Sequence, residues 1–293
     1  MLHRDHISSF LVTNAQHPSA LRTLHKPTQL YVSIDASNKE SLKAIDRPLF
    51  KDFWERTLEC LDILRERQEE MRTVYRFTLV RGFNMDEVPG YGNLIDRGRP
   101  WLIEIKGVSY DVQRTDHTGV TYCGKSDESP LTMGNVPFYE EVVEFAKAIV
   151  QELNQRRNES TDLPEYGIAA EHAHRFSSHR FKTNCSCCIL IARTSLRQEE
   201  KWYTHIDYPR FFELLESGDK FGPLDYVAET PEWAYFGNGG FNPEDVRVKR
   251  NKKADREKEE LALREGIEQI GGRIGKVIEG EDVDVVVGEG CGD

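Results

Sequence analysis

The sequence lacks several features that would place it in a special class. No apolar run approaches the roughly 18–20 residues that a membrane-spanning helix needs, and the first residues, Met1 to Asp5, contain no apolar signal core. Cys185 and Cys188 have the Cys-x2-Cys spacing, but the sequence lacks the second such pair that is typical of closed zinc sites. These absences predict a cytoplasmic protein with no membrane partner and no zinc centre.

The composition indicates an ordinary globular protein. The chain has 293 residues, of which 38% are hydrophobic and 30% are charged, and its length allows one large α/β domain or two small ones. The formal net charge is −11, and residues 279–293 hold six acids and no base. An acidic balance argues only weakly against nucleic-acid binding, because such binding depends on local basic patches. Charge alone therefore does not identify a partner.

Six cysteines are present, and only Cys185, Cys187 and Cys188 lie close together in the sequence. In a long chain without a signal peptide, cysteines are expected to be free thiols or metal ligands before disulfides. Adjacent cysteines on a strand point in different directions, which is poor geometry for a metal site. We therefore predict no metal-binding residues in this sequence.

The first hundred residues alternate between strand and helix patterns. Helical spacing of apolar side chains predicts helices over residues 50–64 and 86–97. Short, nearly continuous apolar strands that alternate with helices favour parallel pairing in a sheet or barrel. The predicted strands are Ile7 to Thr13, Leu30 to Ile34, Val74 to Val80 and Trp101 to Lys106.

The regular alternation of predicted strands and helices changes after residue 130. Pro137 followed by Glu140 and Glu141 predicts a helix start, because proline and acids are favoured in the first turn. Gln155 to Pro164 is expected to be a polar loop. The next two apolar runs, Tyr166 to Ala170 and Cys188 to Ala192, can pair as strands.

Long strings of the sequence carry a resemblance to a known family. They are SSFLVTNAQ (8–16), TQLYVSIDASNKESLKAIDRPLF (28–50), IEIKGV (103–108), TYCGKSDESPLTMGNVPFYEEV (121–142), EYGIAAEHAH (165–174), SCCILIAR (186–193), WYTHIDYPRFFELL (202–215) and TPEWAYFGNGGFNPEDVRV (230–248). In this order they resemble the tRNA 4-demethylwyosine synthases, radical-SAM enzymes that build the wyosine base beside the anticodon of phenylalanine tRNA. The resemblance covers residues 1–250.

The resemblance implies an α/β fold. Residues 1–120 would form part of a radical-SAM (β/α) barrel that lacks its first strands, and residues 121–248 an α+β wyosine-base-formation extension. Low hydrophobicity predicts a charged, largely disordered tail over 249–293. The family's Cys-x3-Cys-x2-Cys loop and Gly-Gly-Glu-Pro-like segment do not occur in this sequence. The resemblance thus predicts that Met1 is an internal start.

Two segments interrupt the family pattern. Residues 111–120 separate Gly107-Val108-Ser109-Tyr110 from Thr121-Tyr122-Cys123-Gly124, and residues 175–185 separate His174 from Ser186. Both are polar and aperiodic, so we expect exposed, poorly ordered loops. They are either retained intronic sequence or genuine insertions.

The resemblance also implies a reaction. A [4Fe–4S] cluster and S-adenosylmethionine would generate a radical that acts on N1-methylguanosine in the anticodon loop of tRNA-Phe, and pyruvate would supply two carbons. A flavodoxin-type or other one-electron donor would be needed. Because this chain lacks the cluster cysteines, we predict that it is inactive in isolation. The alternative is a catalytically inactive truncated paralogue, or an incomplete gene model, that retains a tRNA-binding surface.

Four polar residues at predicted strand ends are candidate S-adenosylmethionine ligands, because ligands of parallel barrels gather at the carboxyl ends of strands. They are Asn14, Ser33, Asp35 and Thr78. Asparagine, serine and aspartate also cap helices and form turns, so a purely structural role remains open for those three.

Five further residues are candidates for catalysis or substrate binding. Glu104 and Lys106 share a strand face and are weak catalytic candidates, with a structural ion pair as the alternative. Glu171, His172 and His174 are candidates for contact with substrate or tRNA, although histidines in strands are often structural.

Aromatic side chains are plentiful after residue 200. They can stack on splayed tRNA bases, but they pack into cores more often. The residues are Trp202, Tyr203, Trp233, Tyr235 and Phe236.

Overall fold

A six-stranded sheet in the order β1-β2-β3-β4-β8-β7 forms the centre of the fold. The computed structural model describes residues 2–46, 48–110, 120–121, 132–174 and 186–243. The strands of the sheet are β1 (Phe10–Thr13), β2 (Gln29–Ser33), β3 (Thr73–Leu79), β4 (Leu102–Gly107), β7 (Tyr166–His174) and β8 (Ser186–Arg193). The described helices are α1 (Pro18–Arg22), α2 (Lys39–Asp46), α3 (Phe53–Glu66), α4 (Val88–Gly98), α5 (Tyr139–Glu159) and α6 (Tyr208–Ser217).

The first four strands run parallel to one another, as the alternation of strands and helices predicts. The extension then adds a hairpin, in which β8 pairs antiparallel with both β4 and β7. The predicted pairing of the two late apolar runs is therefore confirmed. Because β8 lies between β4 and β7, strands from both predicted regions of the chain share one sheet.

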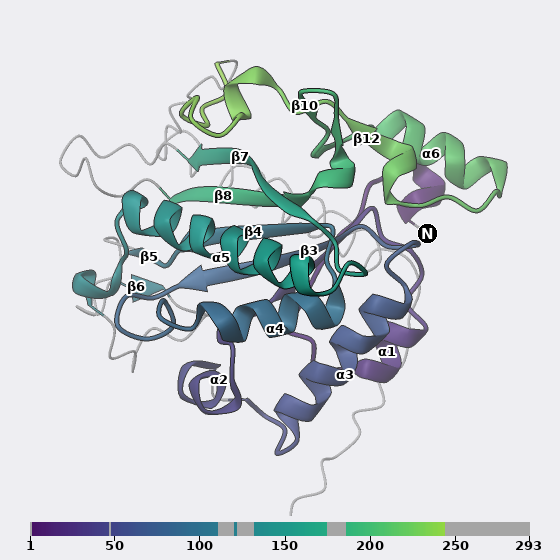
Figure 1. Cartoon of the computed structure of the whole chain (residues 1–293). Helices are drawn as coiled ribbons and strands as arrows, with labels where there is room; N and C mark the ends of the chain where they lie inside the picture. Colours follow the sequence, from purple (N-terminus) through teal and green to yellow (C-terminus); the bar gives the residue numbers. More distant parts are fainter. Residues whose placement is uncertain (1, 47, 111–119, 122–131, 175–185, 244–293) are drawn as a thin grey trace, which may run out of the picture. The chain divides into compact units, whose positions relative to one another are not determined.

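Helices cover one face of this sheet (Figure 1). Strand residues with alternate spacing, such as Val32, Phe77 and Ile105, are fully buried against α3, α4 and α5. The ring of Phe77 packs 4.5 Å from that of Tyr91, measured between ring centroids. This apolar layer is the main core of the described chain.

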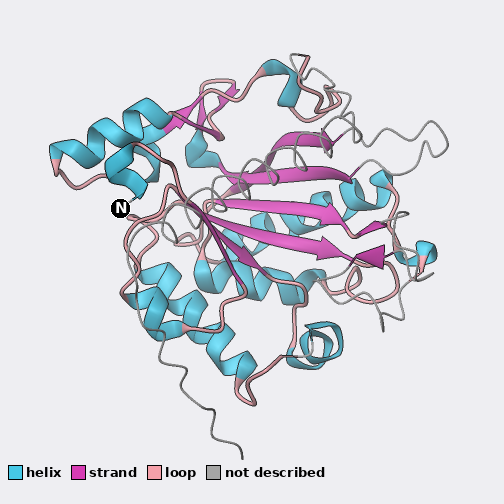
Figure 2. Ribbon diagram, turned by 180° about the vertical axis from the view of Figure 1, so that it is seen from behind, coloured by secondary structure: helices cyan, strands magenta, loops and turns pink. Residues whose placement is uncertain are grey.

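Figure 2 views the sheet from the opposite side, where the strands lie in front of the helices. Short elements of the C-terminal part pack over one end of this second face, around buried Val74, Leu102, Leu196 and Trp202. They are β9 (Arg197–Gln198), β10 (Lys201–Trp202), β11 (His205–Ile206), β12 (Val227–Ala228) and single 3₁₀ turns at Thr194–Leu196, Pro223–Tyr226 and Glu232–Ala234.

Four predicted boundaries differ from the observed ones by three residues or more. The helix predicted over 50–64 begins at Phe53, and the strand predicted over Tyr166 to Ala170 continues to His174. The first strand begins at Phe10 rather than Ile7. The predicted loop from Gln155 is helical as far as Glu159, because Arg156 bonds Glu152 within α5 and also Asn93, Asp96 and the Pro89 carbonyl of α4. These tertiary bonds hold a polar turn in the helical conformation, and sequence periodicity does not reveal them.

The predicted inserts lie mostly outside the described residues, as does the tail beyond residue 243. Only Val120 of the first insert is described, and it pairs with Tyr110 where β5 (Ser109–Tyr110) meets β6 (Val120–Thr121). No helix among the described residues is both long and apolar enough to span a membrane.

Candidate functional site

The predicted polar residues gather at one edge of the sheet. Ser33, Asp35, Thr78 and Lys106 lie at or just beyond the carboxyl ends of parallel strands β2, β3 and β4, and Asn14 directly follows β1. Ligands of open parallel sheets bind at this edge. The structure therefore brings the candidates to one end of the fold.

Two rows of polar side chains cross the face that the helices leave uncovered. The register aligns Ser33, Arg76 and Glu104 in one row. Two residues further along, it aligns Thr78, Lys106, Cys188 and His172 in a second row. Since side chains of aligned and alternate residues share a face, Glu104 and Lys106 point to the same side, as predicted.

Hydrogen bonds organise the first row. Arg76 Nη2 donates to Ser33 Oγ at 3.0 Å, and the Tyr31 hydroxyl donates to Glu104 Oε2 at 3.3 Å. Burial and the neighbouring Glu104 carboxylate raise the pKa of Tyr31. Tyr31 and Arg76 were not among the candidates predicted from sequence, although the strict alternation of β3 places Arg76 on the polar face.

Lys106 lies in the second row, between Thr78 and Cys188 in the register. Among the described residues it forms no ion pair with Glu104, whose carboxylate bonds Tyr31 instead. The ion-pair alternative for these two residues thus has no support in the described contacts. A lysine beside Cys188 and His172 can bind an anionic or carbonyl group, or exchange a proton with it.

The loop that carries Asp35 is held by buried polar side chains. Asn84 donates from Nδ2 to the carbonyls of Asp35 and Thr78 at 2.8 and 2.9 Å, and its own Oδ1 accepts from the Val80 amide. The Glu87 carboxylate accepts four hydrogen bonds from Ser37, Asn38 and Ser41. The ends of β2 and β3 are therefore fixed relative to each other.

An acidic pair lies at the same edge. Asp35 is buried, with 4% of its surface exposed. Burial and the nearby Asp35 raise the pKa of Asp46, the last residue of α2, to about 7. Perturbed carboxyl groups are common at functional sites, but ion networks in a stable core produce them as well.

The turn after β1 is strained. Ala15 has a φ of 57°, in the left-handed region that alanine rarely adopts, and it is only 1% exposed. The Ala15 amide donates to Thr13 Oγ1 at 3.2 Å. This turn leaves the side chain of Asn14 exposed beside the carboxyl ends of the strands, and strained turns occur often at ligand sites.

The three candidates of β7 have different surroundings. Glu171 is buried, and its carboxylate accepts hydrogen bonds from the Tyr139 hydroxyl of α5 and from the Gly239 amide. His172 lies on the polar face, with its ring 5.8 Å from that of Trp233. His174 pairs with Ser186 in the register of β7 and β8.

The predicted aromatic residues are mainly packing groups. Trp202 is 8% exposed, and Tyr235 packs against the same apolar cluster. Phe236 packs against the main core. Trp233 contacts His172 and His205 and is the one that lies beside the polar face.

The described cysteines do not suit a [4Fe–4S] cluster. Cys60 is buried on α3, and burial raises the pKa of its thiol to about 11. Cys188 lies on β8, a strand of the central sheet. Within the described residues no group of three or more histidine, cysteine or acidic side chains can hold a metal ion. A cluster needs three or four thiolates close together.

An open cavity of about 330 Å³ lies away from these candidates. Its lining includes Gln68, Arg99, Asp162, Glu165 and Arg193, which lie beyond the opposite ends of the strands. Arg99 and Asp162 already pair there at 2.6 Å. The polar rows rather than this cavity contain the predicted site.

Comparison with known proteins matches this chain to one group. A family model described as wyosine base formation matches residues 97–193. The S-adenosyl-L-methionine-dependent tRNA 4-demethylwyosine synthase of Schizosaccharomyces pombe is 54% identical over 259 residues, which are 88% of this chain and 34% of that protein. The synthases of Saccharomyces cerevisiae and Homo sapiens are 51% and 46% identical, over 86% and 87% of this chain.

The chain spans about one third of the length of these curated relatives. Among solved structures it is similar to one described as TYW1 with a lysine-pyruvate adduct bound. The sequence identity is 23% and the TM-score is 0.43, and the match covers 66% of this chain and 49% of that one. A likeness at this level assigns neither ligand nor residue roles to the present chain.

Proposed function

Because the region shared with these relatives makes the chain a member of the tRNA 4-demethylwyosine synthase family, we propose that it provides part of the active site of that reaction. The substrate would be N1-methylguanosine in tRNA-Phe, condensed with two carbons of pyruvate in a radical-SAM lyase reaction. The observation that supports this proposal is the polar face of the sheet, where Ser33, Thr78 and Lys106 lie at or near the carboxyl ends of the parallel strands.

In this proposal the strand ends bind S-adenosylmethionine. Asn14 would contact its amino acid part, and Ser33 and Asp35 its ribose hydroxyls, because these side chains donate and accept hydrogen bonds. Thr78 lies beside them on β3. Asn84 and Glu87 act as positioning residues, since they fix the loop of Asp35 without lying at the strand ends themselves.

Lys106 and Glu104 are the proposed catalytic pair. The ammonium of Lys106 would hold or donate a proton, or bind an anionic substrate group, while Tyr31 keeps Glu104 oriented. His172 and His174 would contact the substrate or the tRNA. Glu171 would act indirectly, because its carboxylate is already bound by Tyr139 and Gly239.

The sheet itself is proposed to be part of a (β/α) barrel. Strand β1 pairs only with β2 among the described strands, and Phe10, Leu11 and Val12 are 49%, 40% and 53% exposed. Natural proteins rarely leave an uncharged apolar edge uncovered. Further barrel strands would cover this edge, and the cluster ligands would lie on them rather than on this chain's described cysteines. An outside electron donor would also be required.

A chimera tests the function. Residues 1–243 of this chain would replace the corresponding region of the Schizosaccharomyces pombe relative in cells that lack it, and the wyosine-type bases in their tRNA would be quantified by mass spectrometry. Restored base formation is expected. A chimera that accumulates normally but forms no base would contradict the proposal and favour the second candidate, an inactive paralogue that only docks tRNA.

A further inference from the structure

Cys188 lies between two basic side chains on the polar face of the sheet. In the register of the antiparallel strands it is directly opposite Lys106 of β4 on one side and His172 of β7 on the other. The Cβ atoms of residues that are opposite each other in this way are about 4.5–5.5 Å apart. Cys188 is half-buried and carries a thiol. The sheet therefore places a lysine and a histidine within reach of one sulfur atom.

The charged groups of β4 favour a thiolate at this position. Lys106 is a cation at neutral pH, and it forms no ion pair among the described residues. Glu104 shares this face of β4, but its carboxylate accepts a hydrogen bond from Tyr31. Tyr31 belongs to β2, which lies on the side of β4 that is away from β8. The bond thus draws the carboxylate away from Cys188, whereas the lysine can stabilise a thiolate.

The groups around His172 add no carboxylate to this part of the face. Glu171 directly precedes His172, but its carboxylate lies on the other side of β7, where it is bound by the Tyr139 hydroxyl and the Gly239 amide. The C-terminal segment contributes a second histidine, because Trp233 contacts the rings of both His172 and His205. Basic groups therefore outnumber acidic groups around the thiol.

Cys60 is the opposite case in the same chain. It is only 1% exposed on α3, and burial raises the pKa of its thiol to about 11. A thiol that is buried in apolar surroundings stays protonated and is inert. The two described cysteines should therefore differ strongly in reactivity, and Cys60 serves as an internal control for Cys188.

We propose that Cys188 is a nucleophilic site of the polar face, which forms covalent adducts with small, soft electrophiles. His172 accepts the proton of the thiol, and Lys106 stabilises the thiolate. With iodoacetamide as the electrophile, the sulfur forms a bond to the methylene carbon, and iodide leaves with the electron pair of the broken carbon–iodine bond. The adduct would lie between Lys106 and His172 and block the face proposed for catalysis. The reactivity itself does not depend on that function.

Alkylation kinetics of the full chain test the proposal. The chain would be treated with iodoacetamide between about pH 5.5 and 9.5, and fragmentation mass spectrometry would follow Cys188 and Cys60 separately. The rate at Cys188 should reach half of its plateau near pH 7, below the ordinary thiol pKa of about 8.5. At that pH Cys60 should react at least about tenfold more slowly. A midpoint of about 8.5 or above, or equal rates at the two cysteines, would overturn the site.

Two lysine variants test the cause of this reactivity. Lys106→Met should raise the midpoint at Cys188 by about one pH unit or more, because it removes the neighbouring cation. Lys147→Met is the matched control on exposed α5 and should leave the midpoint unchanged. Circular dichroism would establish that both variants fold, and the measurement on the unmodified chain needs neither of them. An unchanged midpoint in folded Lys106→Met would contradict the proposal.

Discussion

The two faces of the central sheet are built by the same strands, yet they differ in what covers them. On β3, Phe77 points into the helical layer and is fully buried, while its neighbours Arg76 and Thr78 are half-buried on the other face. On β4, Ile105 and Lys106 repeat this contrast. Alternation within one strand therefore separates core residues from the residues that we propose for binding and catalysis, so neighbouring substitutions should have different consequences.

The largest expected effect concerns the helical face. Phe77→Ala should lower the free energy of unfolding by about 3–5 kcal/mol, because it leaves a cavity against Tyr91 in a closely packed core. Thr78→Ala on the opposite face should lower the free energy of unfolding by less than about 1 kcal/mol. Urea denaturation of both variants measures the difference. Equal losses would show that the second face is packed as tightly as the first.

The next effect is a pH dependence at the carboxyl edge. The folded-state pKa of Asp46, about 7, lies above its ordinary value of 3.8. Between these values the folded chain holds a proton that the unfolded chain has lost, so the contribution of Asp46 to stability is complete below pH 3.8 and is lost as pH rises towards 7. Relative to the unmodified protein, Asp46→Asn should become more stable across this window. A constant difference between the two proteins from pH 4 to 8 would disprove the raised pKa.

The smallest expected effect concerns the hydrogen bond between Tyr31 and Glu104. Tyr31→Phe should lower the free energy of unfolding by about 0.5–1.5 kcal/mol. The loss should be at the lower end of this range because the hydrogen bond is long, at 3.3 Å. Tyr235→Phe is the control, since Tyr235 is a partly buried tyrosine that packs against the same apolar cluster as Tyr31. If the control loses as much stability, ring packing and not the hydrogen bond explains the result.

Much of the parallel half of the sheet is predictable from sequence. The predicted limits of β2 and β3 are within one residue of those observed, because apolar and polar residues alternate and turns bound each strand. The placement of β8 between β4 and β7 is a long-range pairing that no local pattern encodes.

The candidate site was predictable in part for the same reason. Ser33, Thr78 and Lys106 could be identified because they lie near strand ends, and the local hydrophobic pattern predicts where these strands end. By contrast, Glu171 contacts Tyr139, which is 32 residues away, and Arg72 contacts Thr204, which is 132 residues away. Sequence periodicity carries no information about such partners, so neither the buried carboxylate nor the buried cation could be anticipated.

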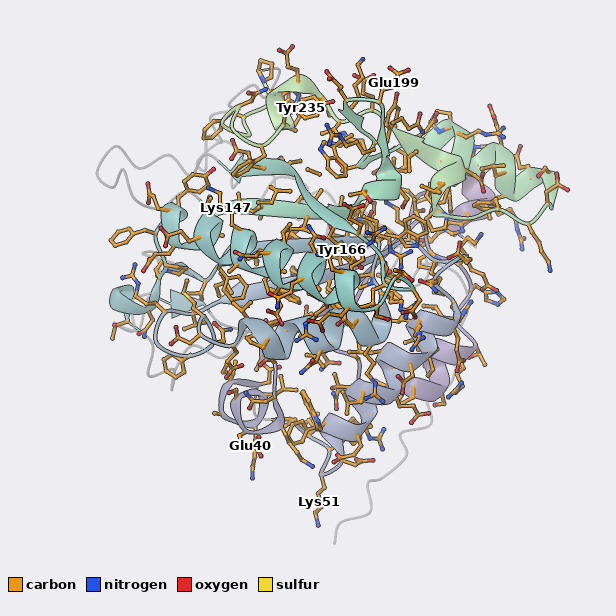
Figure 3. The ribbon with its side chains drawn as sticks, viewed as in Figure 1. Glu40, Lys51, Lys147, Tyr166, Glu199 and Tyr235 are labelled. Atoms are coloured by element: carbon orange, nitrogen blue, oxygen red, sulfur yellow. The ribbon has the colours of Figure 1, made fainter. Side chains whose placement is uncertain are left out.

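We propose that the polar face of the sheet serves the function and that the helical face provides the stability. The most direct test is the tRNA of cells that carry the chimera with Lys106→Ala, compared with Lys147→Ala, an exposed lysine on α5 (Figure 3). Both chimeras should accumulate to the level of the unmodified one. We expect Lys106→Ala to abolish wyosine-type bases and Lys147→Ala to leave them unchanged. Normal base formation with Lys106→Ala would contradict this proposal.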